Sequence, residues 1–408
     1  MQFRAAKTWC LSSVMGFVLG PSMLIAEELP EHFIPVRANG IGGAFTAIAN
    51  DEDAIWTNPA GVARIHKAWS RKGYFGTKFP NMSVGANGKS RDFYQGIQNS
   101  AEGGAEQVAS QADQLGEKPF WAQASAFPMM MFRVGAPVAV GPYAHMQARG
   151  VIDEEAPDQA RINVVTDVGG ALAFAIADRS NRAQLGVGLR SIGRYSYEDT
   201  VPVAVLGDQT TMKARLKDDS NRSAAIGVDV GAMWTLADFW FPTIGAAVLN
   251  VPTSCKKDYL NPFSKKRETV CGTVFTGTFG NPDAVSTVDP TDIRVGVAIT
   301  PRFGRDIAAR LAIDAHHLHF ASGDLNYGYS SVDPLKTLHA GLEVFLGNPL
   351  LPSPFSLSVG LNQGYYSMGA STTISFFSLK VASFGRDISS TSSPQEDRRY
   401  MGSLSFDF

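Results

Sequence analysis

The sequence contains few residues whose types and spacing could carry out chemistry. Three histidines, His316, His317 and His319, lie close together. Zinc needs three or four converging ligands. On a strand, His317 and His319 would share one face and His316 would point to the other. We therefore expect no metal site here, and we interpret these histidines as packing residues near the outer rim of a strand.

Two other patterns for chemistry are weak. The run Gly40-Ile-Gly42-Gly43 is too short for a dinucleotide-binding fingerprint, and neither a preceding strand nor a distal acid supports one. The small residues are better explained by close packing. No nucleophile lies at a suitable spacing from a base. The sequence therefore predicts a protein that is not an enzyme and that needs no metal or cofactor.

Charged residues at alternating positions of predicted strands are the sharper polar feature. Alternation places them on the inward side of the wall that the strands would form. One interpretation, which we favour, is a structural network of salt bridges across a lumen too wide to fill with apolar side chains. The other is a polar track, or anchors for the N-terminal segment. The residues concerned are Arg190, Asp229, Arg294, Arg310, Asp314, Glu343 and Lys380.

The elements that would position these charges are β-strands with two unlike faces. In residues 225–234 one face carries only apolar side chains, from Ile226 to Trp234, and the other carries Gly227, Asp229, Gly231 and Met233. Several later segments repeat this alternation. A uniformly apolar face opposite a small, polar or charged one is typical of a membrane barrel with lipid outside and a polar lumen.

The alternating segments number about fourteen, an even number, as expected for a single-chain bacterial barrel. Every second connection between them is short, whereas the alternate connections include all the long ones. Short turns on one side and long loops on the other are the outer-membrane pattern. The predicted strands are residues 69–77, 120–133, 137–148, 161–177, 182–198, 222–236, 240–251, 292–302, 306–320, 336–346, 354–362, 367–375, 377–384 and 400–408.

Composition agrees with this fold class. The chain has 408 residues and a net charge of -2, so nothing indicates nucleic-acid binding. Hydrophobic residues make up 44%, and beyond the N-terminus no stretch approaches the ~18 continuous apolar residues of a membrane helix. The sequence therefore predicts an all-β transmembrane antiparallel barrel.

The N-terminus shows the features of a signal peptide. Arg4 and Lys7 precede a short apolar stretch, and Ala26 offers a small residue for cleavage. We expect three parts: a signal peptide at 1–26, an irregular plug segment at 27–66 and the barrel at 67–408.

Two cysteines, Cys255 and Cys271, remain after the predicted cleavage and bracket a polar, lysine-rich segment. Exported chains meet an oxidising compartment, so we expect a disulfide in an external loop. Two free thiols are the alternative. Within the first long loop, residues 93–118 read as a solvated helix or disordered insert rather than a partner site.

The end of the chain carries an assembly signal. Tyr400, Phe406 and Phe408 fall on one face of the last predicted strand. A closing strand that ends in phenylalanine resembles the segment recognised by the outer-membrane barrel assembly machinery.

Residues 42–61, Gly-Gly-Ala-Phe-Thr-Ala-Ile-Ala-Asn-Asp-Glu-Asp-Ala-Ile-Trp-Thr-Asn-Pro-Ala-Gly, resemble the N-terminal segment of the FadL-type long-chain fatty acid and hydrocarbon transporters. They resemble the PorV-like relatives still more, and residues 360–408 are similar to the same relatives. The resemblance implies a fourteen-stranded barrel with an inward-folded plug that contains Asn58, Pro59, Ala60 and Gly61.

The resemblance also implies a function. We expect a barrel in the outer membrane of a Gram-negative bacterium, surrounded by its lipids, that takes up hydrophobic or amphipathic small molecules of fatty-acid or hydrocarbon type. The alternative is a PorV-like barrel that transports nothing and binds a protein partner in secretion or surface assembly. The motif does not identify the cargo.

Overall fold

The structure is a computed structural model. The predicted signal peptide and the predicted helix at 93–118 lie outside the residues that it describes. The described residues are 33, 35–65, 75–90, 119–152, 159–202, 205–206, 208–260, 267–277, 288–304, 306–318, 334–346, 355–388 and 394–408.

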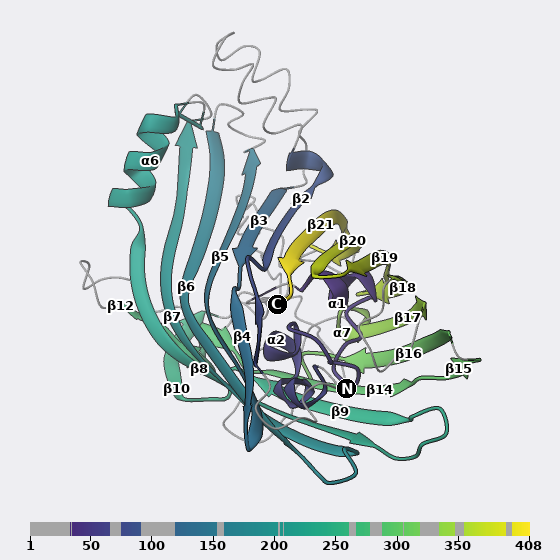
Figure 1. Ribbon diagram of the computed structural model, residues 1–408. Helices are drawn as coiled ribbons and strands as arrows, with labels where there is room; N and C mark the ends of the chain where they lie inside the picture. The colour runs from purple at the N-terminus through teal and green to yellow at the C-terminus, as the bar shows by residue number, and fades with distance from the viewer. Residues whose placement is uncertain are drawn as a thin grey trace, which may run out of the picture.

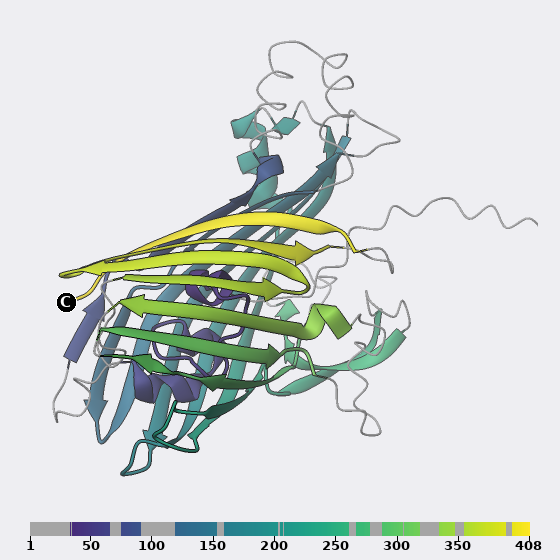
Figure 2. The same cartoon turned by 90° about the vertical axis from the view of Figure 1, so that its right-hand side faces the viewer.

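Fourteen antiparallel wall positions form a closed ring (Figures 1 and 2). The ring closes where the first position pairs with the last, with Met82 opposite Leu404. Closure pairs the first and last strands of the ring with each other, which is what a wall in lipid requires. In order, the ring strands are β2 (Met82–Asn87), β3 (Phe120–Ala126), β5 (Ala136–Ile152), β6 (Gln159–Ala177), β7 (Ala183–Pro202), β8 (Asn221–Thr235), β9 (Thr243–Leu249), β14 (Asp292–Ile299), β16 (Ile307–Ala315), β17 (Leu338–Leu346), β18 (Phe355–Asn362), β19 (Tyr365–Ile374), β20 (Phe377–Asp387) and β21 (Glu396–Phe406).

The first two strands of the barrel are each divided in two by a proline. Pro80 separates β1 (Phe75–Lys78) from β2, and Pro128 separates β3 from β4 (Met129–Val134); β1 pairs with β4 as β2 pairs with β3. Proline lacks the N–H that a ladder needs, so the pairing stops and restarts. The predicted C-terminal end of the first strand, residue 77, was therefore wrong. The strand resumes after Pro80 as β2 and ends at Asn87.

Other boundaries also differ from the prediction. Residue 240 was expected to start a strand, but Trp240 and Phe241 have φ values of 57° and 46°, and Pro242 follows. β9 therefore begins only at Thr243. The last strand begins at Glu396 rather than at residue 400, because residues 396–399 pair with the end of β20.

The wall is much taller on one side. β5 to β8 have 15 to 20 residues each, whereas β16 to β18 have 8 or 9. The helix α6 (Gln209–Asp218) stands beside the upper end of this tall side (Figure 1). At the opposite end, tight turns join β4 to β5 and β19 to β20.

The predicted long loop at 252–291 carries its own small sheet. It consists of β10 (Ser254–Leu260), β11 (Arg267–Val274) and β13 (Val288–Pro290). Two-residue strands also occur, β12 (Thr276–Gly277) against β8 and β15 (Arg302–Phe303) against β16. These strands were not predicted, because the loop is polar and lacks a clear apolar alternation.

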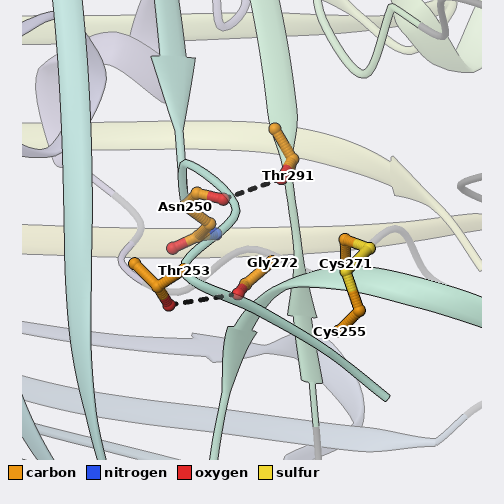
Figure 3. Close-up of a disulfide and its surroundings, with 6 residues drawn as sticks. All are labelled: Asn250, Thr253, Cys255, Cys271, Gly272 and Thr291. Carbon is orange, nitrogen blue, oxygen red and sulfur yellow. Dashed lines mark hydrogen bonds between the residues drawn. A yellow bond between two sulfur atoms is a disulfide. The ribbon is translucent and has the colours of Figure 1, made fainter. Parts of the chain in front are cut away.

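A disulfide joins the first two strands of this small sheet. Cys255 and Cys271 face each other across β10 and β11 and are bonded, as predicted (Figure 3). Nearby, Thr253 Oγ1 donates to the carbonyl of Gly272, and Thr291 Oγ1 donates to that of Asn250 at 2.7 Å. These bonds connect the small sheet to the ends of β9 and β14.

The outer face of the wall is apolar. In β18, Leu357, Val359 and Leu361 are 51–55% exposed, whereas Ser356 and Asn362 on the other face are buried. Leucine and valine exposed in this regular row suit contact with acyl chains rather than water. No helix in the described part of the chain has both the length and the apolar character needed to cross a bilayer.

The N-terminal segment, residues 35–65, lies inside the ring (Figures 1 and 2). It contains α1 (Val36–Gly40), α2 (Ala54–Thr57) and the 3-10 helix η1 (Pro59–Arg64). The wall approaches it through glycines. A Cβ added at Gly341 would lie 2.0 Å from the carbonyl oxygen of Ile41, and one at Gly186 would lie 2.3 Å from the amide of Ala60. The short helix α7 (Pro334–Thr337) leads into β17.

Candidate functional site

The four residues of the predicted plug motif are buried in the lumen. Pro59 ends α2 because it forces Asn58 into an extended conformation, with φ -155° and ψ 102°. The Asn58 amide donates to the carbonyl of Thr46 at 2.8 Å and accepts from the amide of Ala60 at 3.1 Å. The same Nδ2 lies 3.3 Å from the carbonyl of Ala232 in β8. Gly61 packs against Ala49. The motif thus holds two turns of the N-terminal segment together and against the wall.

An acidic triplet on the N-terminal segment meets basic residues of the wall. Lys380 Nζ lies 2.7 Å from Glu52, 3.1 Å from Asp51 and 3.7 Å from Asp53. Lys78 Nζ lies 3.1 Å from Glu52 and 2.9 Å from Asp407 near the chain end. Burial raises the pKa of Asp53 to about 7, and Lys380 opposes that shift. These ion pairs tie the segment to β1, β20 and the C-terminus.

A second tie runs through Arg37 of α1. Its Nε and Nη2 donate to both carboxylate oxygens of Glu343 at 2.8 and 2.7 Å, and its Nη1 donates to Asp51 at 3.0 Å. Arg310 adds a bond to the same glutamate at 3.0 Å. Glu343 is therefore shared between the wall and the N-terminal segment.

Histidines form the third contact between the wall and the segment, and their predicted facing was wrong. His316 was expected to face away from His317. β16 ends at Ala315, and His317 has a φ of 52°, so strand alternation stops there. His316 and His317 are both buried, while His319 lies outside the described residues. The His316 ring stacks on His339 with centroids 4.0 Å apart.

This histidine pair contacts two points on the N-terminal segment. His339 Nδ1 lies 3.0 Å from the carbonyl oxygen of Gly42. His316 Nε2 lies 3.4 Å from Asp314 Oδ2, which accepts the backbone N–H of Thr46 at 2.6 Å. Among the described residues no cluster could hold a metal ion.

All seven predicted lumenal charges are buried. They divide into two groups, so both interpretations of the sequence keep support. Glu343, Asp314 and Lys380 bind the N-terminal segment. The others pair within the wall: Arg190 with Asp229 at 2.9 Å, Arg294 with Asp292 at 2.6 Å, and Arg310 with Glu343 at 3.0 Å.

A cavity of about 220 Å³ lies beside the N-terminal segment, between it and strands β5 to β7, β9 and β14. We call it the lumenal cavity. Trp56 of the segment and Phe33, which precedes it, line the cavity, and their rings stack with centroids 4.5 Å apart. Arg190, Arg194 and several aspartates line it from the wall.

Behind Trp56 the wall is interrupted. Its ring meets Phe127 and Tyr143 edge to face, at 5.2 and 5.1 Å. Beside them, the paired register of β5 skips from Ala126↔Ala144 to Met130↔Val140. The skipped stretch holds Pro128 of one strand and Pro142 of the next, at the level where Pro80 breaks the first position. Trp56 thus lies between the lumenal cavity and this proline-interrupted stretch of the wall.

Sequence reasoning missed several of these residues. Lys78 lay one residue beyond the predicted first strand, and extending the alternation by that residue would have included it. Arg37 and residues 51–53 were read only as part of a compact segment. Nothing in the sequence indicated that Trp56 faces a cavity, because that depends on how the segment folds back into the barrel.

The predicted assembly-signal residues lie on the outer face and at the chain end. Tyr400 and Phe408 are exposed, and Phe406 is partly buried. Phe376 in the turn before β20 stacks with Phe406 and Phe408, at 5.9 Å in both cases. The aromatic end of the closing strand therefore packs on the neighbouring turn.

By sequence, the chain matches no family model and no curated protein. By structure, it is similar to a mutant of TodX, a monoaromatic hydrocarbon channel, with 9% identity, a TM-score of 0.52, and coverage of 92% of this chain and 98% of that one. The toluene transporter TbuX of Ralstonia pickettii has 12% identity, coverage of 92% and 98%, and a TM-score of 0.46. The toluene transporter TodX of Pseudomonas putida has 9% identity, coverage of 93% and 99%, and a TM-score of 0.47. At such identity, the first likeness shows a shared fold.

Proposed function

We propose that the chain is a FadL-type transport barrel of a Gram-negative outer membrane that takes up hydrophobic or amphipathic small molecules. In this proposal residues 27–66 form the plug and residues 67–408 the barrel, after removal of a signal peptide at 1–26. Outer-membrane lipids surround the apolar face, and the assembly machinery reads Tyr400, Phe406 and Phe408.

One observation carries the proposal. Trp56, on the plug, lies between the lumenal cavity and the proline-interrupted part of the wall. A ligand in the cavity contacts the side chain that covers the break. A ligand that binds better when Trp56 has moved aside shifts the plug towards an open state. No covalent chemistry is needed, and the molecule leaves sideways into the lipid.

The contacts between the plug and the wall determine which part of the plug moves first. Glu343, Lys380 and the His316–His339 pair hold α1 and the acidic triplet, whereas Trp56 contacts the rings of Phe33, Phe127 and Tyr143. Ring contacts are weaker than buried, multiply bonded ion pairs, since an aromatic pair contributes about 0.5–1.5 kcal/mol. We therefore expect Trp56 and its turn to move first.

Native mass spectrometry of the gently extracted protein tests this function. A transporter should retain a small apolar or amphipathic molecule, and Trp56→Ala should change the amount retained. Trp234→Ala, on the outer face of β8, is the matched control. Recovery of the barrel with a stoichiometric protein partner and with no small molecule would instead support the PorV-like alternative.

A further inference from the structure

The small sheet formed by β10, β11 and β13 stands at one end of the lumenal cavity. Its inner strand is buried: Cys271 and Thr273 are 2% and 0% exposed, and Phe275, directly after β11, is fully buried. Asp289 and Pro290 of β13 line the cavity itself. The sheet lies towards the end of the barrel opposite the C-terminus (Figure 2). A loop element, rather than a strand of the ring, thus closes this side of the cavity.

The loop that carries the small sheet leaves and rejoins the ring at one place. It begins after Leu249 and ends before Asp292, and these two residues pair with each other. Beside them, Asn250 Nδ2 donates to the carbonyl of Pro290 at 3.2 Å, and Thr291 Oγ1 donates to the carbonyl of Asn250 (Figure 3). Both ends of the loop therefore start from one point of the wall, which is the geometry of a hinge.

Arg194 of β7 holds the sheet at a second point. Its Nη1 and Nη2 donate to the two carboxylate oxygens of Asp289 at 2.9 and 3.1 Å. The guanidinium also lies over the Phe275 ring, with Cζ 3.9 Å from the ring centre. Asp167 of β6 orients the same guanidinium by accepting from Nε and Nη2, both at 2.8 Å. One arginine of the wall thus holds both β13 and the residue that follows β11.

The contact between Arg194 and Asp289 can open without leaving a buried charge uncompensated. When Asp289 moves away with the loop, Arg194 stays paired with Asp167. An uncompensated buried charge would be strongly destabilising, and this arrangement avoids it. The Arg190–Asp229 pair differs, because both of its members belong to strands of the ring. The Arg194–Asp289 contact is therefore built to be released, whereas the Arg190–Asp229 pair is part of the fixed wall.

The disulfide joins the small sheet into one unit. It links Cys255 of β10 to Cys271 of β11, and Thr273 of β11 pairs with Asp289 of β13. The outer strand is thereby bonded covalently to the strand beside Asp289. The ladder contact of the described part of this loop with β8 is the two-residue strand β12. Few backbone bonds therefore oppose movement of the sheet away from the wall.

We propose that β10, β11 and β13 form a lid that opens the lumenal cavity to the outer side of the membrane. The lid turns about Asn250 and Thr291, and it closes when Asp289 binds Arg194. A molecule enters past the lid and leaves past Trp56. This inference rests on the proposed function, because it regulates entry to the same site, but movement of the lid can be measured without transport.

A cysteine placed in the cavity reports whether the lid is open. His145 is buried and lines the cavity, so His145→Cys in the full-length mature protein should react with a charged, water-soluble thiol reagent when the lid opens. Cys255 and Cys271 are bonded to each other and do not react. Asp289→Asn should raise the labelling rate about tenfold, the effect of losing one hydrogen bond between charged groups. Asp238→Asn is the matched control, because Asp238 pairs with Arg182 at an exposed site.

Further measurements separate opening of the lid from loosening of the whole barrel. Thr243 is buried at the other end of β9 from the lid, so labelling of Thr243→Cys should not change when Asp289→Asn is added. Hydrogen exchange should accelerate in residues 267–277 and stay constant in β7. Asp289→Glu keeps the charge and should restore slow labelling at the His145→Cys reporter. Heat-modifiable migration confirms that each variant is folded.

The outcomes are distinct. Unchanged labelling of the His145→Cys reporter in Asp289→Asn, equal acceleration at the Thr243→Cys reporter, unchanged exchange of residues 267–277, or fast labelling in Asp289→Glu would each overturn the lid. If labelling accelerates as expected but cells expressing the wild type or Asp289→Asn take up no N-phenylnaphthylamine above background, the lid stands and the proposed transport function fails.

Discussion

The side-chain amide of Asn58 donates a hydrogen bond of 2.8 Å to the backbone carbonyl of Thr46. The two residues belong to different turns of the N-terminal segment, and Asn58 is fully buried between them and β8. A Cβ at Gly231 would lie 2.0 Å from Asn58 Oδ1. The wall therefore leaves space for this amide, which joins the two turns to the barrel.

Asn58→Ala should loosen the N-terminal segment and leave the barrel assembled. The substitution removes a donor from Thr46 and an acceptor from Ala60, and losing such buried partners costs about 1–3 kcal/mol. We expect raised single-channel conductance in planar bilayers and faster proteolysis of residues 27–66. Asn181→Gly, in an exposed turn, is the control. If the Asn58 variant conducts and is cleaved like wild type, the motif serves only as a turn.

Lys380→Met should release the acidic triplet. Removing one partner of a buried ion pair costs about 3–5 kcal/mol, because the remaining charges are left uncompensated. Hydrogen exchange of residues 50–57 should accelerate. A second variant that also carries Glu52→Gln and Asp53→Asn should recover much of the lost protection. Failure of this rescue would mean that Lys380 acts through packing rather than charge.

Acid should weaken the histidine tie. His316 follows the end of β16, and burial, then the neighbouring His339, hold the pKa of His316 well below its ordinary value. His316 therefore binds a proton more tightly when the N-terminal segment is detached or unfolded than when it is docked. The contribution of His316 to docking of the segment is present above the ordinary histidine pKa of about 6.5 and is lost as pH falls below it.

Proteolysis of residues 27–66 at a series of pH values measures this effect. Asp292, Asp314, Arg294, His317 and Arg386 surround the pair and also contribute. We expect cleavage to rise below about pH 6 in wild type. His316→Phe keeps the stacking and should flatten the profile. An equally steep profile in that variant would assign the acid response to His339 or to the carboxylates instead of His316.

Deletion of residues 405–408 should prevent membrane insertion. Ser405 pairs with Ser378, and the amide of Phe408 donates to the carbonyl of Thr77 at 2.8 Å. The truncation would leave backbone groups unpaired in lipid, at several kcal/mol for each group. Heat-modifiable migration in isolated outer membranes is the readout. Normal migration of the truncated chain would remove these residues from the insertion signal.

Much of the wall follows from the sequence because alternation is a local property. Leu357, Val359 and Leu361 show their outward face without any knowledge of neighbouring strands. Pro80 and Trp240 illustrate the limit, because a break or a left-handed turn depends on backbone geometry that residue patterns only suggest. The contacts of Arg37 with Glu343 and of Trp56 with Phe127 and Tyr143 could not be predicted, since they join residues far apart in the sequence through the path of the inner segment.

Reversible locking of the plug tests the central claim of passage past residues 27–66. A Cβ at Gly231 of β8 would lie 3.0 Å from Asn58 Cγ, so Asn58→Cys with Gly231→Cys can form a cross-link that holds the turn carrying Trp56. The measurement is uptake of N-phenylnaphthylamine into cells that express the variant, before and after reduction. Wild type under the same reductant controls for the Cys255–Cys271 bond. We predict that uptake is blocked when the lock is oxidised and restored when it is reduced. Equal uptake in both states would contradict transport by movement of the plug.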